Sequence, residues 1–317
     1  MNQLENKTVV TRQATSILKI IFEAMVLFHH LYVTQTVFVG HVSSLAGPVA
    51  VGGFLVVSGF GVGINYLKKG SEYSKKLLTK RIPFIYVMLF ITNVFYLIFH
   101  YYTGNTFENV FDLIISVVYL PVFSGFVALS HYIYFLADLI IYYFMFLLFS
   151  KIFRKKKNNL LLTSLSILIL NFVIIAVLTI INANTGSSRY LRACVCFPVG
   201  LLIACFNQQI SKVLDKFKYL IVAGLFAIGV LVYSYIGTKS LIEYLLPVIF
   251  SLAIIILFYK VDLKSKVLDY FAKLVLFVYA SHELFREFII YKYISLDPNI
   301  RMVIVVVASL IIAIIIQ

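Results

Sequence analysis

Charged residues are scarce in this sequence of 317 residues, and acidic residues are the scarcest. Charged side chains make up 13% of the chain, against about 25% in soluble proteins, whereas 62% of the residues are hydrophobic. Apolar runs of about 20 residues recur from end to end, and a soluble fold cannot bury so many of them. The runs lack the period-two alternation of a membrane β-barrel. The composition therefore predicts an all-α, polytopic integral membrane bundle.

Cysteine is also rare. Cys194, Cys196 and Cys205 lie in one apolar stretch, and their spacing fits neither a zinc site nor a disulfide framework. We interpret all three as packing residues, and we expect no metal site and no tightly bound cofactor.

The chain has 27 Lys and Arg against 13 Asp and Glu, a net charge of +14. In a soluble protein this excess would suggest a nucleic acid partner. Here the cations lie in short loops between apolar runs, which is typical of a topology signal. We therefore expect membrane lipids as partners and no nucleic acid.

Ten apolar segments are candidate transmembrane helices. They are residues 17–37, 46–67, 82–100, 131–150, 160–182, 190–206, 219–236, 241–259, 271–291 and 300–316. With a cytosolic N-terminus, 20 Lys and Arg face the cytosol and five face outward, as the positive-inside rule requires. An eleventh segment, 107–123, would invert every later loop if it crossed, so we interpret it as interfacial or re-entrant. The sequence thus predicts a cytosolic tail, 1–16, one multi-pass plasma-membrane domain, 17–317, and two cytosolic termini.

Ionisable residues interrupt the first apolar segment, where each is costly. At 100° and 1.5 Å per residue, Lys19, Glu23 and His30 share one face, and Lys19 lies about 16 Å from His30 along the axis. His29 points about 100° away from that face. This stripe indicates a functional site. The alternative is that Lys19 snorkels, Glu23 pairs with it, and His30 bonds a neighbouring helix.

Two other polar groups allow two interpretations each. His282, with the neighbouring residues Glu283, Arg286 and Glu287, is either a substrate or proton-handling site or a network that holds helices together. Ser58 is either a nucleophile, although no acid–base triad order supports that, or part of a glycine-rich stretch that allows close helix packing.

These residues resemble motifs of the acyltransferase family 3 membrane proteins. Lys19 and His30 match the basic residue and histidine of that family's first helix, and residues 58–60 match its Ser-Gly-Phe run. The basic start of the third helix at residues 80–86 and looser matches at 131–136, 197–200 and 278–282 follow in order. The sequence departs from the family in having Phe84 where a second Arg is common and in containing no tryptophan.

The resemblance implies transfer of an acyl group, usually acetyl, from cytosolic acyl-CoA to a hydroxyl of a cell-surface glycan or lipid-linked glycan. Lys19, Lys80 and Arg81 then form a cationic site for the donor's phosphates. His30 acts as general base on the acceptor, or alternatively forms an acyl-histidine. Glu23 orients Lys19 or lines a water path. Ser58 and His282 are expected to contact substrate, and glycan-synthesis proteins are expected partners.

Two other functions fit a membrane bundle with buried polar residues. An exporter or flippase of a polysaccharide or lipid-linked sugar would need the same aqueous path, but the paired broken helices of many transporters are not evident. A scaffold subunit of a glycan synthase would tolerate substitution of Lys19 and His30.

Overall fold

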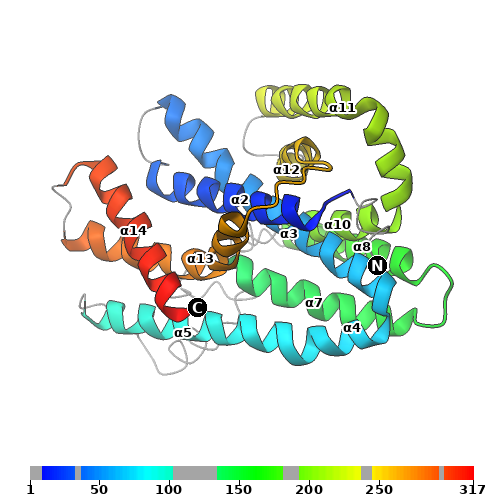
Figure 1. Ribbon diagram of the computed structural model, residues 1–317, viewed down its shortest axis with the longest axis horizontal. Coiled ribbons are helices and arrows are strands. Elements are labelled where there is room, and N and C mark those ends of the chain that lie inside the picture. Colours follow the sequence, from blue (N-terminus) through cyan, green and yellow to red (C-terminus); the bar gives the residue numbers. More distant parts are fainter. Residues whose placement is uncertain (1–8, 33–36, 103–133, 181–192, 237–244, 293–295) are drawn as a thin grey trace.

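The structure is a computed structural model that describes residues 9–32, 37–102, 134–180, 193–236, 245–292 and 296–317. Within these ranges the regular structure is helical, and no strand occurs. The helices, shown in Figure 1, are α2 (Arg12–Tyr32), α3 (Val37–Lys69), α4 (Ser71–Lys76), η1 (Leu77–Arg81), α5 (Ile82–Tyr102), α7 (Tyr134–Ile152), α8 (Asn159–Ile180), α10 (Cys196–Cys205), α11 (Asn207–Ile236), α12 (Leu246–Leu257), α13 (Lys266–Lys292) and α14 (Pro298–Ile316).

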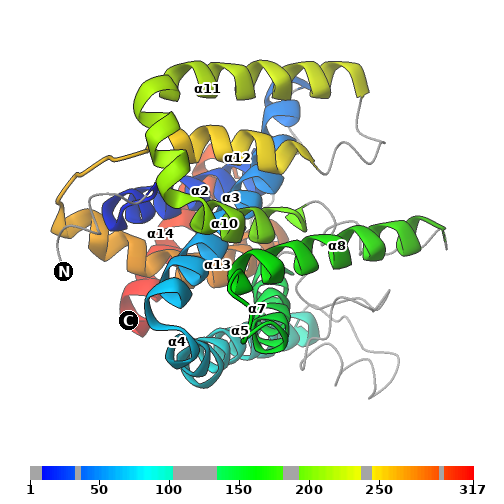
Figure 2. The same ribbon diagram turned by 90° about the vertical axis from the view of Figure 1, so that its right-hand side faces the viewer.

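Helix α3 lies at the centre of the bundle and packs against α2, α10 and α12. Of its apolar window within Val42–Lys69, 78% is buried inside the protein, more than in any other candidate span of the described residues. Both ribbon views place α11 and α12 on one side of it and α5 and α7 on the other (Figures 1 and 2). The all-round apolar sequence of α3 explains this position, because helix packing buries every face of it.

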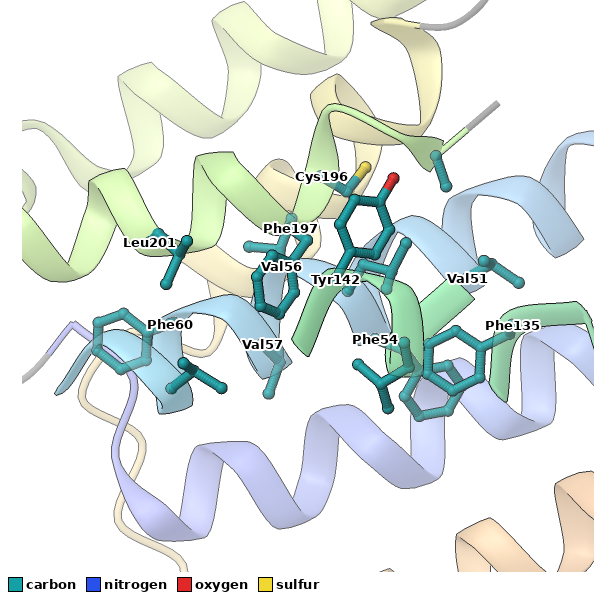
Figure 3. Close-up of a cluster of buried hydrophobic side chains, with 14 of the residues drawn as sticks. Val51, Phe54, Val56, Val57, Phe60, Phe135, Tyr142, Cys196, Phe197 and Leu201 are labelled. Atoms are coloured by element: carbon teal, nitrogen blue, oxygen red, sulfur yellow. The ribbon is translucent and has the colours of Figure 1, made fainter. Parts of the chain in front are cut away.

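Small residues let α3 and α10 approach to backbone contact. A Cβ atom on Gly59 would lie 2.2 Å from the Phe197 carbonyl oxygen, and one on Gly200 would lie 2.1 Å from the Val56 carbonyl oxygen. Figure 3 shows the apolar side chains that surround this crossing, with Phe197 of α10 against Val56 of α3. Close packing is thus a role of the glycine next to Ser58.

Within the described ranges, six stretches of helix are long and apolar enough to cross a membrane. They are Val42–Lys69, Ser71–Phe95, Phe135–Ile152, Asn159–Val177, Asn207–Ser234 and Asn299–Ile316. Each of the ten segments predicted from the sequence overlaps a helix, but α10 and α12 are short, and α2 and α13 carry the ionisable residues of the predicted site. The count of ten spans and the cytosolic side of both termini stay predictions.

Two sequence predictions fall outside the described residues. They are the interfacial segment 107–123 and the first part of the motif at residues 131–136.

Candidate active site

Helices α2 and α13 pack against each other and bring the predicted polar residues together. Helix α2 is continuous from Arg12 to Tyr32, so Glu23 and His30, two turns apart, lie on the same face. That face meets His282 and Glu283 of α13. The stripe predicted on the first apolar segment is therefore half of a site, and α13 supplies the other half.

His30 faces a buried carboxylate that an arginine holds in place. Its Nδ1 lies 3.9 Å from Oε2 of Glu283, whose side chain is fully buried. The Nε of Arg286 donates to both carboxylate oxygens at 2.8 Å, and Nη2 of Arg286 donates to Oε1. Such a forked ion pair fixes the plane of the carboxylate. This distance exceeds a hydrogen bond, so Glu283 acts on the His30 ring as a nearby negative charge on the Nδ1 side, and the opposite atom, Nε2, is the one that can act as a base.

Glu23 and His282 form a second pair next to the first. His282 Nδ1 lies 4.0 Å from Glu23 Oε1, and both side chains are buried. His282 Nδ1 donates to the Val278 carbonyl at 3.2 Å. The Nε2 of His282 and both carboxylate oxygens of Glu23 have no hydrogen-bond partner in the described structure. The interpretation as a satisfied network therefore fits Glu283 and Arg286, but it does not fit His282. The side chain of Glu287, the fourth residue of that network, lies outside the described part of the structure.

The two adjacent histidines of α2 face different helices. His29 Nδ1 donates to the Ser43 carbonyl of α3 at 2.6 Å, and its ring lies against Gly47. The His30 ring instead lies beside the His282 ring, with ring centroids 5.2 Å apart. The 100° offset between neighbouring helical residues predicted this division. His29 attaches α2 to α3, and His30 faces the polar site.

Aromatic rings close the side of the site that faces the core. Tyr279, one turn before His282, has its ring centroid 5.7 Å from the His282 ring. Phe135 of α7 lies 5.4 Å from Tyr279 and 5.3 Å from Phe54 of α3. Figure 3 shows Phe54 and Phe135 side by side. This apolar wall lowers the local dielectric and strengthens charge interactions within the site.

Two of the three predicted cations lie close enough to interact with each other. Lys19 of α2 is half-buried and interacts electrostatically with Arg81 at the end of η1. The buried Tyr143 of α7 interacts electrostatically with Arg81, and its hydroxyl is hydrogen-bonded to Ser58 Oγ at 2.9 Å. Lys80 is exposed beside them. Ser58 is therefore linked to the cationic site through Tyr143, which the sequence did not single out.

Lys19 and Glu23 do not form an ion pair in the structure. Such a pair was the non-functional explanation for the polar face of the first apolar segment. The acceptor atoms of Glu23 are without a partner, and the ion pairs among the described residues do not include Lys19 with Glu23. The carboxyl of Glu23 points to α13 instead.

One set of side chains in the described ranges has the geometry to hold a metal ion, although the sequence predicted none. One ligand atom each of His30, His282 and Glu283 lies within 4.8 Å of the other two. A bound cation would have to share Glu283 with Arg286, whose positive charge opposes it.

A known protein family matches most of the chain. A family model described as an acyltransferase domain covers residues 14–317, and so includes both helices that form the site. No curated protein and no solved structure matches the chain.

Proposed function

Because this chain belongs to the acyltransferase family 3 of membrane proteins, matched over residues 14–317, we propose that it is an O-acyltransferase of the cell surface. The donor is cytosolic acyl-CoA with acetyl as the acyl group. The acceptor is a hydroxyl of a polysaccharide or glycolipid on the far side of the plasma membrane.

The observation that carries the proposal is the contact of His30 with the Glu283–Arg286 ion pair. Glu283 lies 3.9 Å from Nδ1 of His30, and its carboxylate is fixed by Arg286. A carboxylate at Nδ1 stabilises the imidazolium that forms when Nε2 takes a proton. His30 then removes the proton of the acceptor hydroxyl as its oxygen attacks the acyl carbon.

The donor's position follows from the cations. Lys19 and Arg81 interact electrostatically near the predicted cytosolic end of α2, where they suit the phosphate groups of CoA. Lys19 and His30 are 11 residues apart on a continuous helix, about 16 Å along its axis. An extended pantetheine arm spans such a distance and brings the thioester to His30.

The test is transfer of label across a sealed membrane. Vesicles contain the protein and its acceptor glycan, and radiolabelled acetyl-CoA is supplied only on the cytosolic side. We compare the unaltered protein with His30→Gln and with the matched control His29→Gln. The control changes the adjacent histidine, and its amide can still donate to the Ser43 carbonyl.

We expect label in the glycan with the unaltered protein and His29→Gln, and none with a folded His30→Gln variant. Full transfer by His30→Gln would disprove the role of His30. If CoA binds but the unaltered protein transfers no label, then the acyl group or the acceptor is wrong. If CoA does not bind, then the chain is not this enzyme, and export of a glycan becomes the function to test.

A further inference from the structure

We propose that Glu23 and His282 return the proton taken by His30 to the departing CoA thiolate, with Glu23 as the acid that protonates the sulfur. This inference rests on the proposed acyl transfer and extends it to the fate of the leaving group.

The first observation is the concentration of unpaired polar atoms in this pair. Among the described residues, seven buried side-chain nitrogen and oxygen atoms lack a hydrogen-bond partner, and three of them belong to Glu23 and His282. Leaving such groups unpaired costs stability, so most buried polar groups in proteins are bonded. Two such residues next to each other on separate helices therefore point to a chemical role.

The second observation is the position of the His282 ring between the two other groups. Its Nδ1 lies 4.0 Å from Glu23 Oε1, and its ring centroid lies 5.2 Å from that of His30. Because Nδ1 donates to the Val278 carbonyl, Nε2 carries the lone pair, and that atom has no partner. The ring can accept a proton at Nε2 and release the other from Nδ1.

The third observation concerns the state of Glu23. Its carboxyl is 5% exposed and has no cation within ion-pair distance other than His282, should that ring be protonated. Among the described side chains of these two helices, the other charged groups near Glu23 are Lys19, one turn earlier on α2, and the Glu283–Arg286 pair on α13. An ionised carboxylate here would be a buried, uncompensated charge, so the neutral acid is the form that this pocket favours.

The donor's direction places the sulfur near Glu23. The CoA arm extends from Lys19 toward His30, and Glu23 lies between them on the same helix face. The sulfur is on the Lys19 side of the acyl carbon, whereas the acceptor hydroxyl is on the His30 side. The thiolate that leaves is therefore nearer to Glu23 than the attacking oxygen is.

The steps balance. The acceptor oxygen bonds to the acyl carbon and loses its proton to His30, and the carbon–sulfur bond breaks with its electron pair on sulfur. Glu23 gives its proton to that thiolate. His30 passes its proton to Nε2 of His282, and Nδ1 of His282 reprotonates Glu23. The products are the acyl ester and CoA thiol, and His30 and Glu23 regain their first states. His282 is left with its proton on Nε2 instead of Nδ1, so a water molecule takes the proton from Nε2 and returns one to Nδ1 before the next turnover.

The separation of Glu23 and His282 must shorten for this step. A distance of 4.0 Å exceeds a hydrogen bond, so the two side chains move together by about 1 Å or share a water. Catalytic hydrogen bonds are often long without substrate and tighten when it binds.

The kinetic test compares Glu23→Gln and His282→Asn with the unaltered protein in the vesicle assay. Both variants keep polar side chains but cannot relay a proton, so we expect kcat to fall about 100-fold or more, with KM for acetyl-CoA unchanged. Asp138→Asn is the matched control, because Asp138 also has a buried, unpartnered carboxylate oxygen but lies on α7. It should keep its kcat.

A spectroscopic test checks the acid without measuring activity. In the Asp138→Asn protein, infrared spectra should show the carbonyl stretch of a protonated carboxylic acid, and adding Glu23→Gln should abolish that band. A band that persists would show that Glu23 is not the acid.

Other results overturn the inference as well. An unchanged kcat in Glu23→Gln would exclude Glu23 as the acid. A change confined to KM would make Glu23 a donor-binding residue instead. An equal loss of kcat in Asp138→Asn would mean that the effect is structural. If the unaltered protein transfers no label, it is the proposed function that fails, and the infrared result still stands by itself.

Discussion

Substitution of Glu283 should affect the site strongly, because this residue faces both His30 and Arg286. Its carboxylate orients one side chain and neutralises another. Substituting either residue should lower stability, because it breaks the buried ion pair, and substituting Glu283 should lower kcat as well.

We expect Glu283→Gln to lower kcat by about 100-fold or more, because the amide neither fixes the charged ring nor stabilises the imidazolium. Initial rates in the vesicle assay measure this effect. A rate within a few-fold of the unaltered protein would contradict the proposed role of Glu283.

Removing Arg286 alone should destabilise the fold. Arg286→Gln removes the cation that neutralises the buried carboxylate of Glu283, and breaking such a pair typically costs about 3–5 kcal/mol. The double variant with Glu283→Gln should recover much of that loss, because neither charge is then unpaired. Thermal unfolding in detergent distinguishes these outcomes. Equal stability of the single and double variants would contradict the ion pair.

Tyr143 joins the cationic site to Ser58, and its hydroxyl should matter for donor binding. Tyr143→Phe removes the hydroxyl that is bonded to Ser58 and interacts with Arg81. A neutral hydrogen bond is worth about 0.5–1.5 kcal/mol, so KM for acyl-CoA should rise by about two- to tenfold, with a smaller change in kcat. Steady-state kinetics with varied acetyl-CoA checks this. An unaltered KM would show that Arg81 is held without Tyr143.

The residues of the site could be predicted only in part. Lys19, Glu23 and His30 share a helix face that periodicity reveals, and His282 and Glu283 stood out as ionisable residues in an apolar segment. Their contact could not be predicted, because it depends on how α2 and α13 pack, and no local pattern encodes that. Tyr143 gave no signal at all, because tyrosine is common in this chain and ordinary in apolar helices.

At the scale of elements, the α3–α10 crossing tests the packing argument. Gly59→Ala would place a Cβ 2.2 Å from a backbone oxygen, which cannot move aside without shifting α10. We expect a loss of about 1–3 kcal/mol. Gly61→Ala is the matched control, because its Cβ would meet no atom within 4 Å, and alanine favours helix by about 1 kcal/mol.

Thermal unfolding followed with a thiol-reactive dye suits this comparison, because Cys194 and Cys196 are buried until the bundle opens. The Gly59 variant should unfold at a lower temperature than the unaltered protein, and the Gly61 variant should not. Equal temperatures for both variants would mean that the crossing tolerates a wider spacing.

For the whole molecule, the positions of the helices along the chain followed from hydropathy, and the membrane class followed from composition. The number of membrane crossings could not be derived from hydropathy, because four of the ten segments overlap helices that are short or that carry ionisable residues. Charge in the loops is the remaining signal, and it predicts orientation rather than packing.

The predicted orientation has a direct test. Lys155 lies in the exposed turn between α7 and α8, and the positive-inside rule places it in the cytosol. Lys155→Cys should react with a membrane-impermeant thiol reagent in inverted vesicles and not in intact cells. The unaltered protein serves as background, since its cysteines are buried or half-buried. Labelling in intact cells would invert the predicted topology.

The division of the site between α2 and α13 also has a consequence for how the protein is made. Membrane helices are inserted in the order of their synthesis, so His30 enters the bilayer long before Glu283 emerges from the ribosome. Until then the nascent chain holds a histidine without its carboxylate and Glu23 without His282. A chain interrupted before α13 should be inactive, and the growing protein should not consume acyl-CoA before its synthesis is complete.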